Sequence, residues 1–346
     1  MPATRTAVIG YGFAGRCFHA YLVGLTPGLE LHGIASRNPE TQEKIRARGD
    51  CRVYTSFDEV LDDPEIELVV LATPNDVHAE YSIRALGAGK HVVVDKPMCL
   101  NLGECDQMIA AAQSSGKILS VFQNRRWDGD FLTVKQLMAE GKLGDVRWIE
   151  MAWQKFGPNG GWRGQSQDKG GGRFYDLGAH LVDQLLQFFP ERITGVYCRM
   201  QHDFPEREVE STATIVVHFE GGRTGFCDVS SLAAFSKPRF LVHGTGGSFM
   251  KYEVDPQEAA MIKGDIDAAR EDPANYGRLS DGKTETVIPT LPGRWRNYYE
   301  NIAGVINGTQ APAVRLEEVR RAIAVFDAAR QSAHSEEVVK VDIPSV

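Results

Sequence analysis

Three polar side chains in the sequence have the chemistry of acid–base catalysis, namely Lys96, Asp176 and His180. Lys96 ends a predicted parallel strand, at the edge where ligands of open α/β sheets bind. Asp176 and His180 stand four residues apart and share one face of a predicted helix. Such a histidine can take a hydroxyl proton near neutral pH, and an ammonium group can stabilise a developing alkoxide. A capping aspartate, a core histidine and a surface lysine are the structural alternative.

A glycine turn near the N-terminus could hold a ligand for these groups. The stretch AVIGYGFAG has the pattern G-x-G-x-x-G, made of Gly10, Gly12, Phe13, Ala14 and Gly15 with Tyr11 between the first two glycines. A predicted strand precedes the turn, a predicted helix to about Gly24 follows it, and a second strand covers residues 29–36. This order predicts a dinucleotide-binding unit with the pyrophosphate at the helix N-terminus.

The choice of dinucleotide depends on the end of the second strand. An NAD site usually has a carboxylate there, whereas an arginine suits the 2′-phosphate of NADP. The sequence reads GIASRNPE, so Ser36 and Arg37 occupy this corner. We therefore expect NADP in preference to NAD, although Arg37 as a solvated loop residue is the alternative.

Two further segments need a decision from their context. Residues 277–284, GRLSDGKT, match G-x-x-x-x-G-K-[ST], but no buried strand precedes them and no helical pattern follows, so we interpret the match as chance. The segment NRRWDGDF (124–131) follows the last predicted strand of the first domain. Its Asn124 could reach the cofactor or substrate, while its arginines and aspartates could equally form a structural ion-pair network.

Composition excludes several classes of protein. The 346 residues carry a net charge of −8, so no basic surface for nucleic acid or an anionic membrane is expected. No apolar run approaches the length of a membrane span, and no secretory signal is visible. The six cysteines contain no C-x-x-C pair, which favours reduced thiols and a cytoplasmic location.

The predicted elements divide the chain into two domains. Residues 1–122 alternate strands and helices, which predicts a doubly wound, parallel Rossmann domain for the cofactor. Residues 123–346 contain helices and then successive strands, which predicts an α+β domain with a large, mostly antiparallel open sheet for substrate binding and oligomerisation. A C-terminal helix at about 316–333 could pack back on the first domain. The polar residues 262–286 are expected to form a long loop.

The combined motifs resemble those of the glucose–fructose oxidoreductase/inositol dehydrogenase/MocA-like family. The resemblance rests on AVIGYGFAG, LATPNDVHAEYSIRALGAGKHVVVDKP and YDLGAHLVDQ, and it covers almost the whole chain. Two other stretches, NRRWDGDFLTVKQLMAEGKLG and FLVHGTGGSFMKY, are most similar to those of the NADP-dependent scyllo-inositol dehydrogenases and their close relatives.

The resemblance implies roles for individual residues. Lys96, Asp176 and His180 match the family's catalytic lysine and D-x-x-x-H pair. The residues that match its nucleotide-lining and nicotinamide- or substrate-lining positions are Thr73, Pro74, Asn75, His78, Trp162 and Arg163. Asp95 replaces the more frequent glutamate of the E-K-P motif, which changes its reach toward the ribose or the lysine. We expect Lys96, Asn124, Arg163, Asp176 and His180 to meet the substrate.

These observations lead to one preferred function. We expect reversible hydride transfer between NADP and a secondary alcohol of a cyclic polyol or sugar, which requires no metal. His180 would be the base, Lys96 would stabilise the alkoxide, and Asp176 would orient His180 or grip a substrate hydroxyl. An aldose 1-dehydrogenase or another sugar oxidoreductase is the alternative, with a loop at 294–301 recognising the ring; a non-catalytic NADP(H) sensor is a third. The family's open sheet face implies a homodimer or homotetramer.

Overall fold

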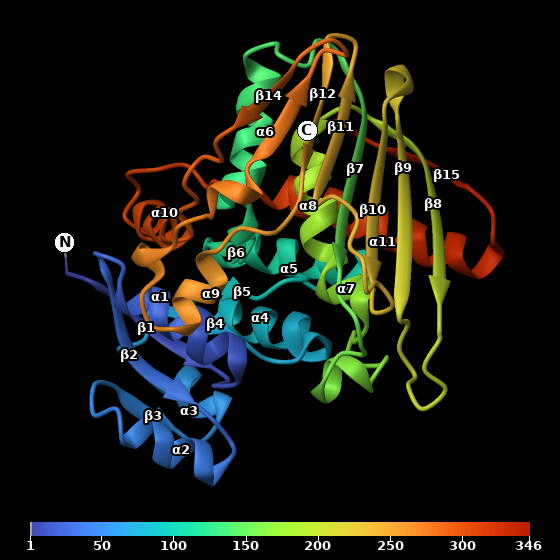
Figure 1. Cartoon of the computed structure of the whole chain (residues 1–346). Coiled ribbons are helices and arrows are strands. Elements are labelled where there is room, and N and C mark those ends of the chain that lie inside the picture. The colour runs from blue at the N-terminus through green and yellow to red at the C-terminus, as the bar shows by residue number, and fades with distance from the viewer. Residues whose placement is uncertain (1) are drawn as a thin grey trace. The chain divides into compact units, whose positions relative to one another are not determined.

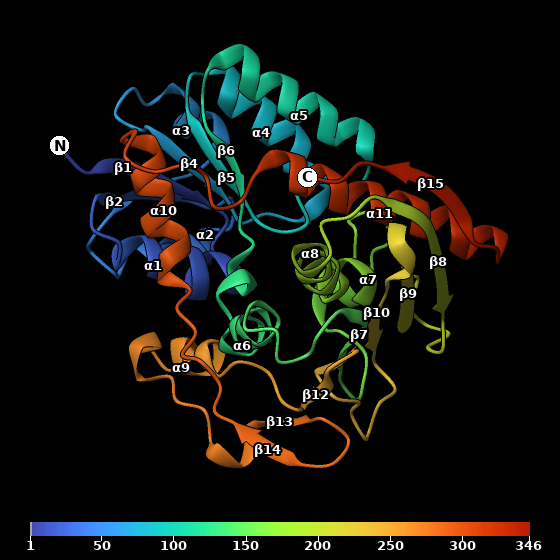
Figure 2. The same ribbon diagram turned by 90° about the horizontal axis from the view of Figure 1, so that it is seen from above.

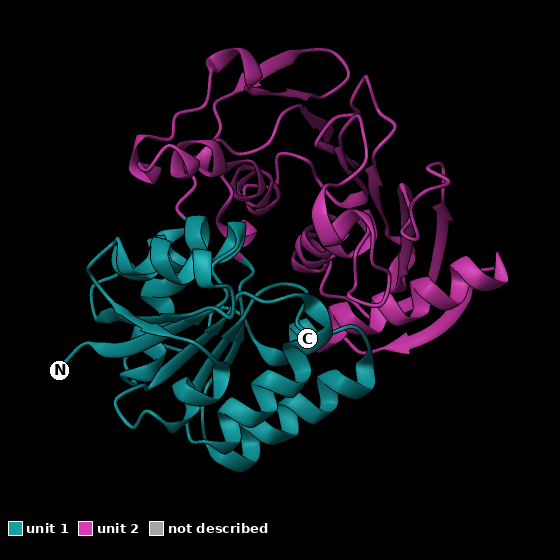
Figure 3. Ribbon diagram, turned by 90° about the horizontal axis from the view of Figure 1, so that it is seen from below, with its two compact units in different colours: residues 1–123, 295–319 teal, residues 124–294, 320–346 magenta. Residues whose placement is uncertain are grey.

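The computed structural model describes residues 2–346, and the chain forms two compact units (Figure 3). The first unit contains the chain up to residue 123 together with residues 295–319. The second contains residues 124–294 and 320–346. The chain first passes from one unit to the other after residue 123, next to the predicted domain border at 122. That residues 295–319 belong to the first unit was not predicted from the sequence.

The first unit is built on a six-stranded sheet in the order β3-β2-β1-β4-β5-β6, and every neighbouring pair in it is parallel (Figure 2). Its strands are β1 (Thr4–Ile9), β2 (Leu29–Ala35), β3 (Arg52–Tyr54), β4 (Leu68–Leu71), β5 (His91–Val94) and β6 (Leu119–Val121). All four residues of β4 are buried, because helices cover both faces of the sheet. The predicted doubly wound α/β fold is confirmed.

Helices connect these strands in the predicted alternation. They are the π-helical η1 (Ala14–Ala20), α1 (Tyr21–Gly24), α2 (Pro39–Arg46), α3 (Phe57–Asp62), the 3₁₀ turn η2 (Asn75–Val77), α4 (His78–Gly87), α5 (Leu102–Ser115) and α10 (Arg296–Ile306). Asn38, Ser56 and Asn101 cap α2, α3 and α5 by accepting backbone N–H bonds. The helix that follows the glycine turn starts at Ala14.

The segment 294–301 is not the surface loop that the sugar-dehydrogenase alternative required. Trp295, Tyr298 and Tyr299 are buried in the first unit, where Tyr298 lies 3.0 Å from the hydroxyl of Ser120 on β6. Arg296 donates to the carbonyl oxygen of Leu25 at the end of α1. The apolar face of α10 packs within the first unit. The prediction of a sugar-recognising surface loop at 294–301 is therefore wrong.

The second unit is built on a nine-stranded sheet in the order β14-β13-β12-β11-β7-β10-β9-β8-β15 (Figure 1). Its strands are β7 (Val146–Gln154), β8 (Ile193–Gln201), β9 (Thr212–Phe219), β10 (Thr224–Ser230), β11 (Phe240–Gly244), β12 (Gly247–Lys251), β13 (Gly277–Ser280), β14 (Glu285–Ile288) and β15 (Val339–Ile343). Among the described strands of this sheet, only β7 and β10 pair in parallel. Along β9 buried residues alternate with half-exposed ones, as in a sheet with one covered face.

One prediction for the second unit needs correction, while the interpretation of residues 277–284 as a chance match agrees with the structure. The expected loop at 262–286 contains strand β13 and the start of strand β14, and the matched residues 277–284 form β13 and the turn of this hairpin. In its turn the N–H groups of Lys283 and Thr284 donate to the Asp281 carboxylate, so they do not form a phosphate-binding loop. Polar, alternating edge strands resemble a loop in composition, which is why the sequence analysis missed them.

The helices of the second unit lie on one face of its sheet and at its edge (Figure 2). They are η3 (Asn124–Trp127), α6 (Gly129–Ala139), η4 (Gly161–Gly164), α7 (Arg173–Asp176), α8 (Gly178–Phe188), η5 (Glu220–Gly222), α9 (Gln257–Ile262), η6 (Ile266–Ala268), η7 (Pro273–Asn275) and most of α11 (Leu316–Ser335). Phe326 of α11 packs edge-on against Phe174 of α7, with ring centroids 4.8 Å apart. The described part of the chain contains no helix long and apolar enough to cross a membrane.

Candidate active site

The glycine turn has different constraints at each of its glycines. Gly10 has a φ of +94°, and a Cβ there would lie 2.5 Å from the carbonyl oxygen of Ala72. A Cβ on Gly15 would overlap the carbonyl oxygen of Gly10. A Cβ on Gly12, in contrast, would meet no described atom within 4 Å. Packing therefore explains Gly10 and Gly15, while the missing side chain of Gly12 leaves room for a ligand to approach the backbone.

The end of β4 provides a second polar group beside this turn. The hydroxyl of Thr73 is buried and has no hydrogen-bond partner within residues 2–346. Asn75, two residues later in η2, is also buried. Together with the space at Gly12, the buried Thr73 hydroxyl fits a bound dinucleotide, because a buried hydroxyl is rarely left without a partner. Phe13, the first residue after Gly12, is half exposed and packs edge-on against Phe18.

The corner after β2 contains no carboxylate at the ribose position. Ser36 accepts a hydrogen bond from the Asn38 N–H through its hydroxyl, and Arg37 between them is exposed. The nearest acid in the chain, Glu40, is paired with Lys44 one helical turn later. The guanidinium of Arg37 therefore precedes the N-terminus of α2, and both favour a phosphate.

His78 is a structural histidine in this unit. Its ring is completely buried, with Nδ1 2.8 Å from the carbonyl oxygen of Pro97 and Nε2 3.1 Å from that of Thr73. Burial lowers the pKa of His78, so the ring is neutral near pH 7. The ring connects the segment after β4 to the turn after β5.

Asp95 and Lys96 lie at the carboxyl end of β5. Asp95 is buried, and its Oδ1 accepts the backbone N–H of Lys96 at 2.8 Å. Its Oδ2 lies 3.6 Å from Nε2 of the buried His19. Lys96 itself is half-buried and is joined to Pro97 by a cis peptide bond. The shorter carboxylate at this position thus contacts the polypeptide, and His19 is a neighbour that the sequence analysis did not identify.

The remaining predicted site residues belong to the second unit. Asp176 ends α7 and His180 lies in the first turn of α8, so Leu177 divides the single helix that the sequence predicted. His180 is buried, and its ring centroid lies 5.7 Å from that of Trp153 on β7. No signal in the sequence identified Trp153 as a neighbour of His180, because a tryptophan in an alternating strand is typical of the hydrophobic core.

Asp176 interacts with two guanidinium groups. Its Oδ1 lies 3.4 Å from Nε of Arg163, and its Oδ2 lies 4.0 Å from Arg173. Arg163 also stacks on Trp162, 4.6 Å from the ring centroid. Arg173 is buried and donates to the Ser231 hydroxyl. The predicted residues Trp162, Arg163 and Asp176 are therefore brought together, and Asp176 is the only carboxylate ion-paired with Arg163 in the described chain.

A buried carboxyl group supports the start of α7. Glu210 accepts the backbone N–H of Phe174 at 2.6 Å, and a side chain at Gly172 would collide with its carboxylate. Burial raises the pKa of Glu210 to about 7, although the Phe174 N–H and Arg173 act in the opposite direction. Asp176 thus follows a helix turn whose first residues are held by a titratable group.

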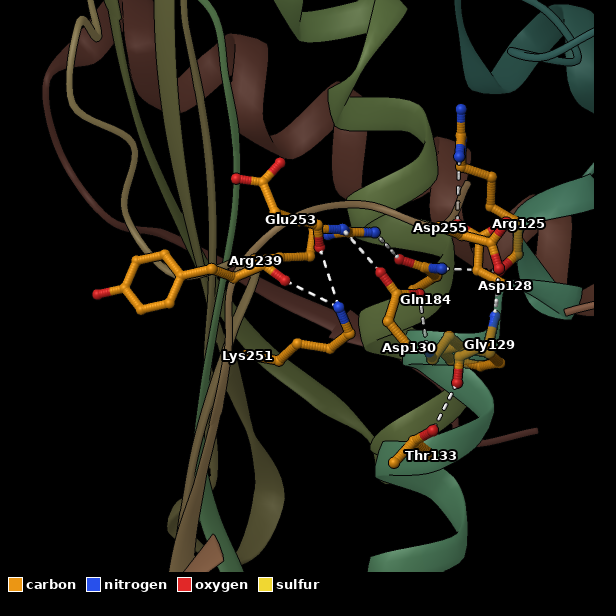
Figure 4. A network of polar contacts seen from close by, with 12 residues as sticks. Arg125, Asp128, Gly129, Asp130, Thr133, Gln184, Arg239, Lys251, Glu253 and Asp255 are labelled. Atoms are coloured by element: carbon orange, nitrogen blue, oxygen red, sulfur yellow. Dashed lines mark hydrogen bonds and ion pairs between the residues drawn. The ribbon is translucent and has the colours of Figure 1, made fainter. Parts of the chain in front are cut away.

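The segment NRRWDGDF forms an ion-pair network around α8 (Figure 4). Arg126 binds Asp183 of α8 with two parallel hydrogen bonds of 2.9 and 2.7 Å, and both groups are buried. Gln184 donates to the carbonyl oxygen of Arg125 and accepts from Arg239. The structural reading of this segment is confirmed for its arginines, which hold the helix that carries His180. Asn124 is buried at the start of η3.

Comparisons with known proteins agree with this architecture. Residues 4–123 match the model of the oxidoreductase family with an NAD-binding Rossmann fold, and residues 131–250 match that of the GFO/IDH/MocA C-terminal domain. The uncharacterized oxidoreductase YdgJ of Escherichia coli is 37% identical, with 88% of this chain and 89% of YdgJ covered. The scyllo-inositol 2-dehydrogenase (NADP(+)) IolW of Bacillus subtilis is 33% identical, with 98% and 96% covered.

A solved structure shares the fold over the full chain. YvaA of Bacillus subtilis superposes with a TM-score of 0.91 at 30% identity and covers 99% of each chain. The two family matches, these identities and the shared fold together establish the resemblance noted from the sequence. The chain belongs to the GFO/IDH/MocA family of oxidoreductases, whose N-terminal domain binds NAD(P).

Proposed function

We propose that the protein is an NADP-dependent dehydrogenase acting on a secondary alcohol of a cyclic polyol or sugar, with a scyllo-inositol-type substrate favoured. The observation that carries the cofactor choice is the corner after β2, where exposed Arg37 stands and no carboxylate does. The substrate class is supported by the relative IolW, which is named as an NADP(+)-dependent scyllo-inositol 2-dehydrogenase. NADP, when bound, supplies the nicotinamide that accepts or returns the hydride.

The protein's own residues then manage the proton and the charge. A ring nitrogen of neutral His180 accepts the hydroxyl proton as the hydride leaves the carbinol carbon. The Lys96 ammonium group donates a hydrogen bond to the same oxygen and stabilises the negative charge that develops there. In the reverse direction, the protonated imidazole of His180 returns the proton to the carbonyl oxygen.

Asp176 has a binding role in this proposal. Its carboxylate is partly exposed and is held by Arg163 and Arg173, so its orientation is set before substrate arrives. A fixed carboxylate beside a guanidinium offers an acceptor and donors to neighbouring ring hydroxyls, as a polyol requires. The stacked Trp162 and Arg163 pair borders this carboxylate.

A substrate screen tests the proposed function directly. Reduction of NADP⁺ and NAD⁺ should be followed with inositols, aldoses and sugar acids. Lys96→Ala and His180→Ala should each lower kcat by about 10²–10⁴-fold, as for loss of an acid–base or electrostatic group, while Lys44→Ala on the exposed face of α2 should not. Near-wild-type turnover in both active-site variants would reject these roles. Turnover of aldoses alone would favour the aldose dehydrogenase, and NADPH binding without turnover would favour a sensor.

The cofactor choice has its own test. Arg37→Ala should raise KM for NADP⁺ by about tenfold, the value of one charge-assisted phosphate contact, and leave KM for NAD⁺ unchanged. Lys44→Ala removes a cation from α2, the helix that follows Arg37, without touching the corner and is the matched control. Equal effects on both cofactors would show that Arg37 does not contact the 2′-phosphate.

We also propose that the uncovered sheet face forms a homodimer or homotetramer. On this face Trp148 of β7 is 39% exposed and lies against Phe226 of β10, with ring centroids 4.1 Å apart. A large exposed aromatic group on an open sheet is typical of an interface. Light scattering should show an oligomer that Trp148→Glu weakens; a wild-type monomer would exclude the proposal.

A further inference from the structure

A series of buried polar contacts within the first unit leads to the backbone of Lys96. Tyr299 of α10 lies with its hydroxyl 2.7 Å from Nδ1 of His19 in η1. Nε2 of the same ring lies 3.6 Å from Oδ2 of Asp95. The other oxygen of Asp95 accepts the backbone N–H of Lys96 at 2.8 Å. Tyr299, His19 and the neighbours Asp95 and Lys96 come from three distant segments of the chain and form one line that ends at the lysine.

The hydrogen positions along this line follow from the acceptors. Burial, with contributions from Tyr298 and Asp95, raises the pKa of Tyr299 well above its ordinary value, so its hydroxyl stays protonated and donates to Nδ1 of His19. With Nδ1 accepting from Tyr299, the Nε2 atom carries a ring proton and faces the Asp95 carboxylate. The Tyr299 hydroxyl meets an acceptor, while the Nε2 side of His19 faces the Asp95 carboxylate at 3.6 Å, within ion-pair range but beyond hydrogen-bond distance. The charge of Asp95 is therefore not left alone in the core.

Packing adds to the case that the line has a task. His19 is completely buried and its ring centroid lies 4.5 Å from that of Phe122, an environment in which an apolar side chain would be cheaper. The line also fits the short side chain at position 95. The Asp95 Oδ2 atom lies 3.6 Å from Nε2 of the fully enclosed His19, and the additional methylene of a glutamate would change this separation.

We propose that His19 and Tyr299 are positioning residues that hold Asp95 and, through it, the backbone of Lys96. This proposal rests on the role of Lys96 in the proposed function. His78 fixes the same turn from the other side through the carbonyl oxygen of Pro97. The backbone N–H of Lys96 and the carbonyl oxygen of the following Pro97 are thus each held by a buried partner, which limits where the ammonium group can go.

Two adjacent tyrosines provide the test. Tyr299→Phe removes only the hydroxyl that faces His19, while Tyr298→Phe removes an equally buried hydroxyl that faces Ser120. Both variants lose one buried hydrogen bond, and their Tm values should fall by similar amounts. Tyr299→Phe should lower kcat by about tenfold, because a displaced catalytic group loses rate steeply, with the NADPH Kd unchanged. Tyr298→Phe should keep kcat within about twofold.

Equal losses of kcat in the two variants would overturn the proposal, because packing alone would then explain both. A second readout does not depend on turnover: acetylation of Lys96 by acetic anhydride, resolved by peptide mass spectrometry and normalised to the exposed Lys44. Tyr299→Phe should change this ratio at least about twofold and Tyr298→Phe should not. If no substrate is turned over at all, the proposed function fails, while this ratio still decides the role of His19 and Tyr299.

Discussion

The two units position their candidate site residues by different physical means. In the first unit the groups lie at strand ends and in a glycine turn, where backbone geometry and small residues set their places. In the second unit Asp176 is ion-paired with Arg163 from another segment, and α8, which carries His180, is joined to η3 by the buried Arg126–Asp183 pair. Backbone geometry is local in sequence, whereas charge networks join distant segments. A sequence motif can therefore describe the candidate site residues of the first unit, whereas the contacts of those in the second unit depend on the fold.

The largest loss of stability is expected when the Arg126–Asp183 pair is broken. Both side chains are buried and doubly hydrogen-bonded, so Arg126→Leu leaves an uncompensated carboxylate on the helix that carries His180. We expect a loss of about 3–5 kcal/mol in the free energy of unfolding, measured by urea titration. The double variant Arg126→Leu/Asp183→Leu should recover much of that loss, since no charge remains buried. A loss below about 1 kcal/mol in the single variant would show that α8 is held by apolar packing alone.

The alternation of strands and helices in residues 1–122 could be read from the sequence because every element there has a local pattern. Apolar runs such as 68–71 are buried on both faces, and Gly10, Gly12 and Gly15 lie close together in the chain. The buried position of Tyr298 and Tyr299 could not be read, because aromatic residues beside arginines suit a surface loop equally well. Only the contacts of α10 with other elements of the first unit distinguish a buried helix from a surface loop.

The second unit shows the opposite balance. Its alternating strands from β8 to β12 were predicted, but the hairpin of β13 and β14 was not, and β7 was overlooked. The motif D-x-x-x-H identified Asp176 and His180, yet the partners Arg163, Arg173 and Trp153 come from other elements. Burial turns ordinary residues into supports for the site, and burial is a property of the fold.

Glu210 gives a smaller effect with a defined sign. Burial raises its pKa from 4.5 to about 7 in the folded protein, so the folded state binds more protons than the unfolded state between these values. The stabilising contribution of its proton is complete below pH 4.5 and is lost as pH rises through about 7. Relative to Glu210→Gln, the wild type should lose about 1–3 kcal/mol of stability between pH 5 and pH 8. Exposed Glu208→Gln is the control, and parallel pH profiles for all three proteins would contradict the prediction.

The smallest change in stability should come from the glycine turn, where two glycines have different reasons to be small. Gly15→Ala places a methyl group against the carbonyl oxygen of Gly10, a backbone atom that cannot move aside, and should cost about 1–3 kcal/mol of stability. Gly12→Ala meets no protein atom, so its free energy of unfolding should stay within about 0.5 kcal/mol of the wild type. The same methyl group would occupy the space through which the pyrophosphate approaches the backbone, and NADPH affinity should fall at least about tenfold. Chemical denaturation and NADPH fluorescence titration separate the two effects. Unchanged NADPH affinity in Gly12→Ala would mean that the open space at this turn is not where the cofactor's phosphates bind.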